Sequence, residues 1–192
     1  GEEAGLKIEH IINEPSAAAL FYTNESENND DGLILVYDLG GGTFDVSIVD
    51  VKISKKKVDV RTSQGDQLLG GHDFTDKIIE IFNKAYKKKY NVDLVDKKNK
   101  LTYKSFFSIA EEVKKTLSKL DKTSVELNGS KGSLNVEVSK KEFENSISTL
   151  LVRTELLIDG ALKDLKIKTN AVIDIALAIV VRLFNFRFVF TM

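Results

Sequence analysis

The sequence has no cysteine, a single proline and only two histidines. Without cysteine the chain can form neither a disulfide framework nor a thiolate metal site. The two histidines, His10 and His72, lie too far apart in the sequence to suggest a metal-binding pair. The lone proline, Pro15, rules out a proline-rich linker. The chain is therefore expected to be an ordinary globular protein without a cysteine-based centre.

The chain also has no excess of one charge, because its 28 basic side chains nearly balance its 29 acidic ones and leave a net charge of −1. A near-neutral balance gives no overall attraction to nucleic acid or to an anionic membrane, so we expect neither as a partner. The chain begins without a basic segment followed by an apolar one, so no secretory signal is visible. Together with the absence of cysteine, this favours a cytoplasmic location.

Long hydrophobic runs are missing as well, although 42% of the 192 residues are hydrophobic. The apolar run Ile175–Val181 is too short to span a bilayer. The length allows one large domain or two small ones.

The first third of the chain has the patterns of a helix followed by strands. Ser16–Phe21 contains good helix formers, and Pro15 suits a first helical turn. Leu33–Tyr37 is a continuous apolar run, which is typical of a strand buried on both faces. Thr43–Val51 and Lys57–Thr62 alternate and are rich in β-branched residues. Three neighbouring strands with short connections predict a β-meander.

From residue 74 onward the periodicity becomes helical. One helix is predicted from Phe74, Ile78, Ile81, Phe82 and Ala85, and a second from Phe106, Ile109, Val113, Leu117 and Leu120. Alternating residues on both sides of Asn128–Gly132 predict a hairpin. Ser139 and Glu142 have the spacing of a capping box, which predicts the start of a long helix. The expected order is meander, two helices, hairpin and long helix.

The segment Asp38–Asp45 carries the clearest chemical signal. Three glycines, Gly40, Gly41 and Gly42, connect two predicted strands, so backbone N–H groups can face a ligand without Cβ obstruction. Successive N–H groups of this kind form a nest that binds phosphate. Asp38, at the end of an apolar strand, could hold hydrated Mg²⁺, and Thr43 offers a hydroxyl nearby. The alternative is a glycine-rich hairpin with a capping aspartate, and the residues alone leave both interpretations open.

Three motifs occur together in this chain: Asn13–Ala19 (Asn-Glu-Pro-Ser-Ala-Ala-Ala), Asp38–Asp45, and Leu69–Phe74 (Leu-Gly-Gly-His-Asp-Phe). Together they resemble the 70-kDa heat-shock chaperone family. The glycine segment is shared with actin and the sugar kinases, whereas the other two motifs are much more specific. The resemblance covers roughly Ala4 to Asn170 and corresponds to the second lobe of the family's ATPase domain. It implies an α/β fold of the actin-like, ribonuclease H-like type, with a β-meander sheet and a helical subdomain that carries a hairpin.

The resemblance also implies roles for the matching residues. Glu14 resembles the glutamate that contacts the Mg²⁺ shell and the attacking water, and Asp38 resembles the aspartate that orders the hydrated cation and accepts a proton. Gly40, Gly41, Gly42 and Thr43 resemble the loop around the β- and γ-phosphates, and Asp45 resembles a further carboxylate of that site. Gly70 and Gly71 are also implied as nucleotide-binding residues. Such a site works by positioning and electrostatics. The implied cofactors are ATP or ADP with Mg²⁺.

The segment Glu111–Ser118 resembles the family's adenosine-contacting helix. Glu111, Lys114, Lys115 and Ser118 are spaced to lie on one helical stripe. Glu111 and Lys114 are then expected to hold the ribose, and Lys115 and Ser118 the adenine. Lys115 replaces an arginine found in many relatives and so loses a planar group able to stack. Without the family context, a solvated charged helix face explains the same residues.

The resemblance implies four segments. Residues 1–69 form a sheet subdomain with a crossover helix, residues 70–139 a helical subdomain with a hairpin, and residues 140–177 a long helix and a returning strand. Residues 178–192 are expected to be an aberrant apolar tail, because the family's Gly-Gly-x-x-Arg turn is replaced there by a different sequence.

The implied function is that of a chaperone fragment, with Mg²⁺-dependent ATP hydrolysis driving protein folding in an intact parent. The first lobe, with its phosphate loop and catalytic lysine, has no counterpart here, so the isolated chain is expected to be inactive. Nucleotide-exchange factors and J-domain co-chaperones are the implied partners, and unfolded polypeptide would bind only through a missing domain. The alternatives are a non-catalytic module bound by exchange factors and a fragment of another actin or sugar-kinase superfamily member.

Overall fold

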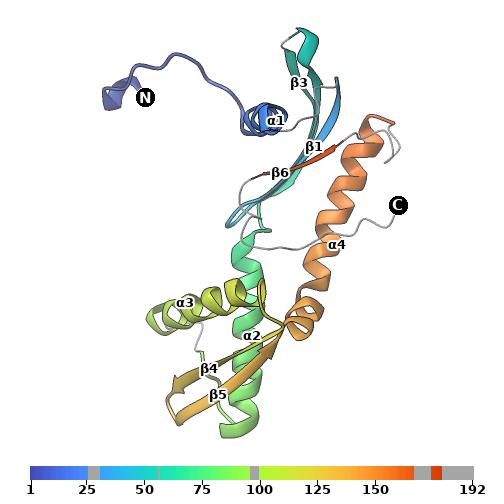
Figure 1. Cartoon of the computed structure of the whole chain (residues 1–192). Coiled ribbons are helices and arrows are strands. Elements are labelled where there is room, and N and C mark those ends of the chain that lie inside the picture. The colour runs from blue at the N-terminus through green and yellow to red at the C-terminus, as the bar shows by residue number, and fades with distance from the viewer. Residues whose placement is uncertain (26–30, 56, 96–99, 167–173, 179–192) are drawn as a thin grey trace. The chain divides into compact units, whose positions relative to one another are not determined.

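The computed structural model describes residues 1–25, 31–55, 57–95, 100–166 and 174–178. These residues form two compact units (Figure 1). The sheet unit comprises Gly1–Asp38, Asp45–Gly65 and Leu157–Ala178, and the helical unit comprises Leu39–Phe44 and Asp66–Leu156. The predicted tail lies outside the described residues, apart from residue 178.

The sheet unit is built on four strands in the order β3-β2-β1-β6. The strands are β1 (Gly32–Leu39), β2 (Phe44–Lys52), β3 (Lys57–Asp66) and β6 (Asp174–Ala178). The first three are consecutive neighbours, which confirms the predicted meander. β6 pairs in parallel with β1, placing Ile34 opposite Asp174 and Asp38 opposite Ala178. The expected returning strand is therefore present, and it enters the sheet after the chain has built the helical unit.

Helix α1 (Glu14–Glu25) packs against one face of this sheet. Its Ala19 is fully buried and forms a cluster with Val36 of β1 and Val49 of β2. Leu35 and Tyr37, which alternate with Ile34 and Val36, are also at least 97% buried. Successive side chains of a strand point to opposite faces, so both faces of β1 are covered, as the apolar run predicted.

The helical unit contains two helices, a hairpin and most of a long helix. The two helices are α2 (Gly71–Tyr90) and α3 (Lys100–Leu117), and the hairpin consists of β4 (Lys122–Gly129) and β5 (Gly132–Ser139). The long helix is α4 (Lys140–Asp164), whose residues from Leu157 onward belong to the sheet unit. Two short 3₁₀ segments, η1 (Glu2–Ala4) and η2 (Ile53–Lys55), belong to the sheet unit. The predicted order of elements is confirmed. Among the helices that the described residues form, none is long and apolar enough to cross a membrane.

The core of the helical unit follows the predicted periodicity closely. Phe74, Ile78 and Phe82 of α2 are buried, as are Phe106, Val113 and Leu117 of α3. The prediction was wrong for Leu120, which lies beyond the end of α3 and is 54% exposed. Beyond the last residue of α3, the backbone N–H groups of Lys119 and Leu120 both bond the carbonyl of Thr116 and close a final turn. At the start of α4, Ser139 Oγ accepts a hydrogen bond from the Glu142 N–H at 3.1 Å, as the capping pattern predicted.

The hairpin is attached to α2 through Tyr86, whose side chain is fully buried. The Tyr86 hydroxyl donates to the Gly132 carbonyl at 3.1 Å and accepts from the Lys131 N–H at 2.9 Å. A Cβ atom at Gly129 would lie 2.5 Å from the Tyr86 ring, so the absence of a side chain there is a packing requirement.

We expect Tyr86→Phe to lower the free energy of unfolding by about 1 kcal/mol, because both hydrogen bonds are lost while the ring is retained. Gly129→Ala should cost more, since the added methyl group collides with a fully buried ring. Urea titration of the 192-residue chain measures both changes. Equal midpoints for the wild type and both variants would contradict this account of the hairpin.

Candidate functional site

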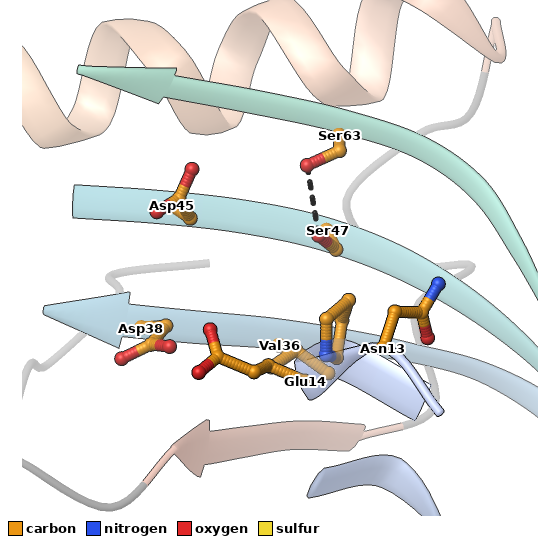
Figure 2. Close-up of a pocket in the computed structure, with 8 residues that line it drawn as sticks. Asn13, Glu14, Val36, Asp38, Asp45, Ser47 and Ser63 are labelled. Carbon is orange, nitrogen blue, oxygen red and sulfur yellow. Dashed lines mark hydrogen bonds between the residues drawn. The ribbon is translucent and has the colours of Figure 1, made fainter. Parts of the chain in front are cut away.

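Three predicted carboxylates line one cleft of the sheet unit (Figure 2). Asp38 lies near the end of β1, Asp45 near the start of β2, and Glu14 is the first residue of α1. The cleft has a volume of about 280 Å³, and its other lining residues are Asn13, Pro15, Val36, Ser47 and Ser63. Figure 2 shows the Glu14 carboxylate directed toward Asp38, with Asp45 on the neighbouring strand. The structure therefore brings these three predicted site residues together.

Local interactions at the start of α1 and across the sheet define this cleft. Asn13 Oδ1 accepts a hydrogen bond from the Ser16 N–H at 3.3 Å, which caps the first turn. Pro15 occupies the second helical position, where its missing N–H costs nothing. Across β2 and β3 the Ser47 hydroxyl donates to Ser63 Oγ at 3.0 Å. Asn13 thus sets where the helix begins, and the start of the helix directs Glu14 into the cleft.

The electrostatics of the cleft favour a cation. Burial, together with the nearby charges of Glu14 and Asp45, raises the pKa of Asp38 above its ordinary value. None of the eight lining residues is basic. Within the described part of the chain, no group of three or more His, Cys, Asp or Glu side chains is arranged to hold a metal ion. A hydrated Mg²⁺ ion keeps several of its own waters and needs only one or two carboxylates, so the lining residues fit that ion.

The predicted glycine turn is part of the helical unit and is bonded to the start of α2. The Gly40 N–H donates to the Thr43 carbonyl at 2.8 Å and closes the turn. The Gly71 N–H donates to the Gly40 carbonyl, and the His72 N–H donates to the Gly41 carbonyl, each at 2.8 Å. The Asp38–Asp45 and Leu69–Phe74 motifs are far apart in the sequence, but backbone hydrogen bonds join them in the structure.

The approach of Gly70 to this turn is too close for a side chain at position 70. A Cβ atom there would lie 2.5 Å from both Cα and N of Gly42. By contrast, a Cβ atom at Gly71 would meet its nearest neighbour, the Gly40 carbonyl oxygen, at an ordinary 3.5 Å. Gly41 and Gly42 are themselves exposed.

The residues predicted on α3 form two separate pairs. Lys114 Nζ contacts Glu111 Oε2 at 2.7 Å, and Lys114 is only 4% exposed. Lys115 Nζ instead bonds Glu112 at 2.8 Å. Ser118 follows the last residue of α3, and its hydroxyl donates to the Lys115 carbonyl at 2.6 Å.

Sequence analysis missed one buried polar residue beside the first pair. Thr75 is fully buried on α2, and its hydroxyl lies 2.8 Å from Lys114 Nζ and 2.5 Å from Glu111 Oε2. Lys114 Nζ also donates to the Gly71 carbonyl at 3.0 Å. A signal was present in the sequence, since Thr75 follows directly after the Leu69–Phe74 motif.

The charges of this buried pair are mutually stabilised. Burial opposes ionisation of Glu111, but hydrogen bonds from Lys114 and Thr75 and the charge of Lys114 outweigh it and lower the pKa of Glu111. Burial also lowers the pKa of Lys114, and Glu111 counteracts that effect. Glu111 and Lys114 therefore each favour the charged form of the other.

Substituting the closely approached glycine tests whether the turn and α2 form one structure. We expect Gly70→Ala to cost about 1–3 kcal/mol of unfolding free energy, because the methyl group must push the turn away. Gly71→Ala, the matched control, should cost less, since its methyl group has space. Urea unfolding measures the cost, and amide exchange at His72 reports the bond to Gly41. Equal costs and equal exchange in the two variants would contradict the proposed contact.

The raised pKa of Asp38 predicts how the stability of the folded chain depends on pH. Because the folded state binds this proton more tightly than the unfolded state, stability falls as the pH rises from about 3.8 through the raised pKa. Asp38→Asn removes the partly buried charge and its repulsion by Glu14 and Asp45, so its melting temperature at pH 7 should exceed that of the wild type.

The difference should shrink as the pH falls through the raised pKa and vanish below about 3.8. Thermal melts between pH 3 and pH 8 measure it, with Glu126→Gln, an exposed carboxylate of β4, as the control. A variant that is less stable than the wild type at pH 7 would show that the carboxylate is needed for folding.

Comparison with known proteins agrees with these features. The chain matches the family model described as Hsp70 protein over residues 1–179. It is 38% identical over 184 residues to the mitochondrial heat shock 70 kDa protein of Pisum sativum, covering 92% of this chain and 26% of that protein. It is 38% identical over 183 residues to the chaperone protein DnaK of Cyanidium caldarium, covering 92% and 29%. With the chaperone protein DnaK1 of Prochlorococcus marinus it shares 37% identity over 167 residues, covering 84% and 24%.

The chain thus spans about a quarter of the length of these curated relatives. The family match confirms the resemblance that the three motifs suggested, and it extends beyond Asn170 to include β6. Because the family model covers nearly the whole described chain, the chain belongs to the Hsp70 family.

Proposed function

We propose that this chain supplies the nucleotide-handling second lobe of an Hsp70 ATPase with the actin-like fold. The observation that carries the proposal is the cleft in which Glu14, Asp38 and Asp45 converge without a basic residue in its lining. Burial, together with this concentration of like charge, raises the pKa of Asp38 and costs folding free energy. A bound cation offsets that cost, and Mg²⁺ accompanies the nucleotide in this family.

Glu14 and Asp38 would hold a hydrated Mg²⁺ ion through hydrogen bonds to its water shell. Asp38 would also accept the proton that the attacking water loses. Asp45 adds negative charge to the same cleft. The bound ion neutralises charge on the phosphates.

The glycine turn is the proposed phosphate-binding element. Gly41 and Gly42 are exposed, so their N–H groups are accessible to phosphate oxygens, and Thr43 adds a hydroxyl. Gly70 and Gly71 start α2, whose N-terminal dipole favours a nearby anion. On α3, Glu111 and Lys114 are proposed to hold the ribose, and Lys115 and Ser118 the adenine.

For the whole protein we propose ATP hydrolysis that drives protein folding, as a chaperone. Nucleotide-exchange factors and J-domain co-chaperones are the proposed partners, and unfolded polypeptide is the proposed client of a further domain. The proposed subdomains are residues 1–69, 70–139 and 140–177. Alone, this chain should turn over ATP very slowly, because removing even one stabilising donor from such a site can cost about 10²–10³ in rate.

One observation favours a second function, a module bound by nucleotide-exchange factors. The helical unit has its own core, and its hairpin is held to α2 by the buried Tyr86. A rigid unit of this kind can serve as a docking surface whether or not nucleotide binds.

Calorimetry on the 192-residue chain tests the proposal. We expect Mg-ATP to bind, and Asp38→Asn to weaken that binding about tenfold, since hydrogen bonds to charged groups are worth about 1.5–3 kcal/mol. With EDTA this disadvantage of Asp38→Asn should disappear, because the carboxylate acts through the cation. Glu126→Gln is the control and should match the wild type.

Two results would contradict the proposal. One is equal affinity of wild type and Asp38→Asn for Mg-ATP, and the other is a wild-type chain that binds an exchange factor but no Mg-ATP. The second result would favour the interaction module. Turnover comparable to that of an intact relative would contradict the expected inactivity of the isolated chain.

A further inference from the structure

The hydroxyl group of Thr75 lies at the centre of a hydrogen-bonded network in the helical unit. Thr75 is fully buried. Its Oγ1 lies 2.5 Å from Glu111 Oε2, 2.8 Å from Lys114 Nζ and 3.0 Å from the Gly71 carbonyl oxygen. The proposed nucleotide-binding residues of α3 and of the Gly70–Gly71 segment therefore meet at one hydroxyl of α2.

The Thr75 hydroxyl lies within hydrogen-bond distance of two acceptors but can donate to only one of them at a time. A threonine hydroxyl carries one proton, whereas Lys114 can only donate. The single proton must therefore go either to Glu111 or to the Gly71 carbonyl. The shorter, charge-assisted contact is the one to Glu111, and Lys114 meanwhile donates to Gly71 at 3.0 Å.

The peptide between Gly71 and His72 connects this choice to the glycine turn. Its carbonyl is the acceptor beside Thr75, and its N–H is the donor that bonds the Gly41 carbonyl at 2.8 Å. A hydrogen bond accepted by a peptide carbonyl polarises the N–H of the same peptide and strengthens the bond that this N–H makes. Whether the Thr75 proton points to Glu111 or to the Gly71 carbonyl therefore affects the strength of the hydrogen bond from His72 to Gly41 in the glycine turn.

We infer that Thr75 is a positioning residue that couples the ribose end of the nucleotide site to its phosphate end. When a ribose hydroxyl replaces Thr75 as the donor to Glu111 Oε2, the Thr75 proton turns to the Gly71 carbonyl, and the bond from His72 to Gly41 is strengthened. Adenosine bound at α3 thereby orders the turn that receives the phosphates. The inference rests on the proposed function, which supplies the ligand.

Amide hydrogen exchange on the 192-residue chain tests this coupling at the His72, Gly71 and Gly40 amides. The probe is adenosine, which has the ribose but no phosphate that could contact the turn itself. In the wild type, adenosine should slow exchange at His72 about three- to tenfold. Thr75→Val keeps the shape and removes the proton, so the response should disappear. Thr75→Ser keeps the proton and should restore the response.

The matched control is Thr154→Val, which removes another buried hydroxyl of the helical unit. Thr154 is 1% exposed, and its hydroxyl donates to the carbonyl of Leu151 in its own helix. This variant should keep the adenosine response. Retention of the response in Thr75→Val, or its loss in both Thr75→Ser and Thr154→Val, would overturn the inference.

Failure of the proposed function gives a different result. If calorimetry shows that the wild type does not bind adenosine, the proposed adenosine contacts on α3 are wrong. The coupling then falls together with those contacts. Adenosine binding without slower exchange at His72 in the wild type would overturn the coupling alone.

Discussion

The close approach of Gly70 to the glycine turn is the constraint on which the candidate site depends. Two backbone hydrogen bonds, from Gly71 and His72, join the start of α2 to the turn. They can form only because position 70 has no side chain, since a Cβ atom there would overlap the backbone of Gly42. The N-terminus of α2 is thus fixed beside an exposed loop, and this arrangement suits a bound anion.

The carboxylate cleft, in contrast, destabilises the fold, because it brings the negative charges of Glu14, Asp38 and Asp45 together. Asp38 is placed in a half-buried position between Glu14 and Asp45, and its pKa rises for that reason. A protein selected only for stability would neutralise such a group with a basic neighbour. The lining of the cleft contains none, so the arrangement makes physical sense when a cation provides the missing charge.

Much of the fold could be predicted because hydrophobic periodicity reports burial directly. The run Leu33–Tyr37 gave a strand covered on both faces, and the spacing from Phe74 gave α2. The end of α3 was less predictable, since Leu120 continues the apolar pattern although the chain has already turned. Periodicity records which side chains could share a face, whereas hydrogen bonding of the last turn decides where the helix stops.

The parts of the candidate site that depend on backbone contacts could be predicted, because those contacts require particular residue types in the sequence. The pairing of its side chains was harder to predict. Gly70 is visible in the sequence because its close contact with Gly42 needs a residue without a side chain. The contact between Glu111 and Lys114 follows from helical spacing, but Lys115 turns to Glu112 instead. Thr75 was missed although it directly follows the Leu69–Phe74 motif, because a single hydroxyl on a helix gives no periodic pattern.

The α3 pair also constrains how a ligand can bind there. Lys114 is almost completely buried, and it already has the Glu111 carboxylate, the Gly71 carbonyl and the Thr75 hydroxyl as partners. Removing any of these without replacement would leave a buried charge under-solvated, at a cost of several kcal/mol. A ribose that binds this pair must therefore exchange hydrogen bonds with the network one for one. Binding at α3 is consequently a rearrangement of existing bonds, and the groups that lose a partner must find another within the same unit.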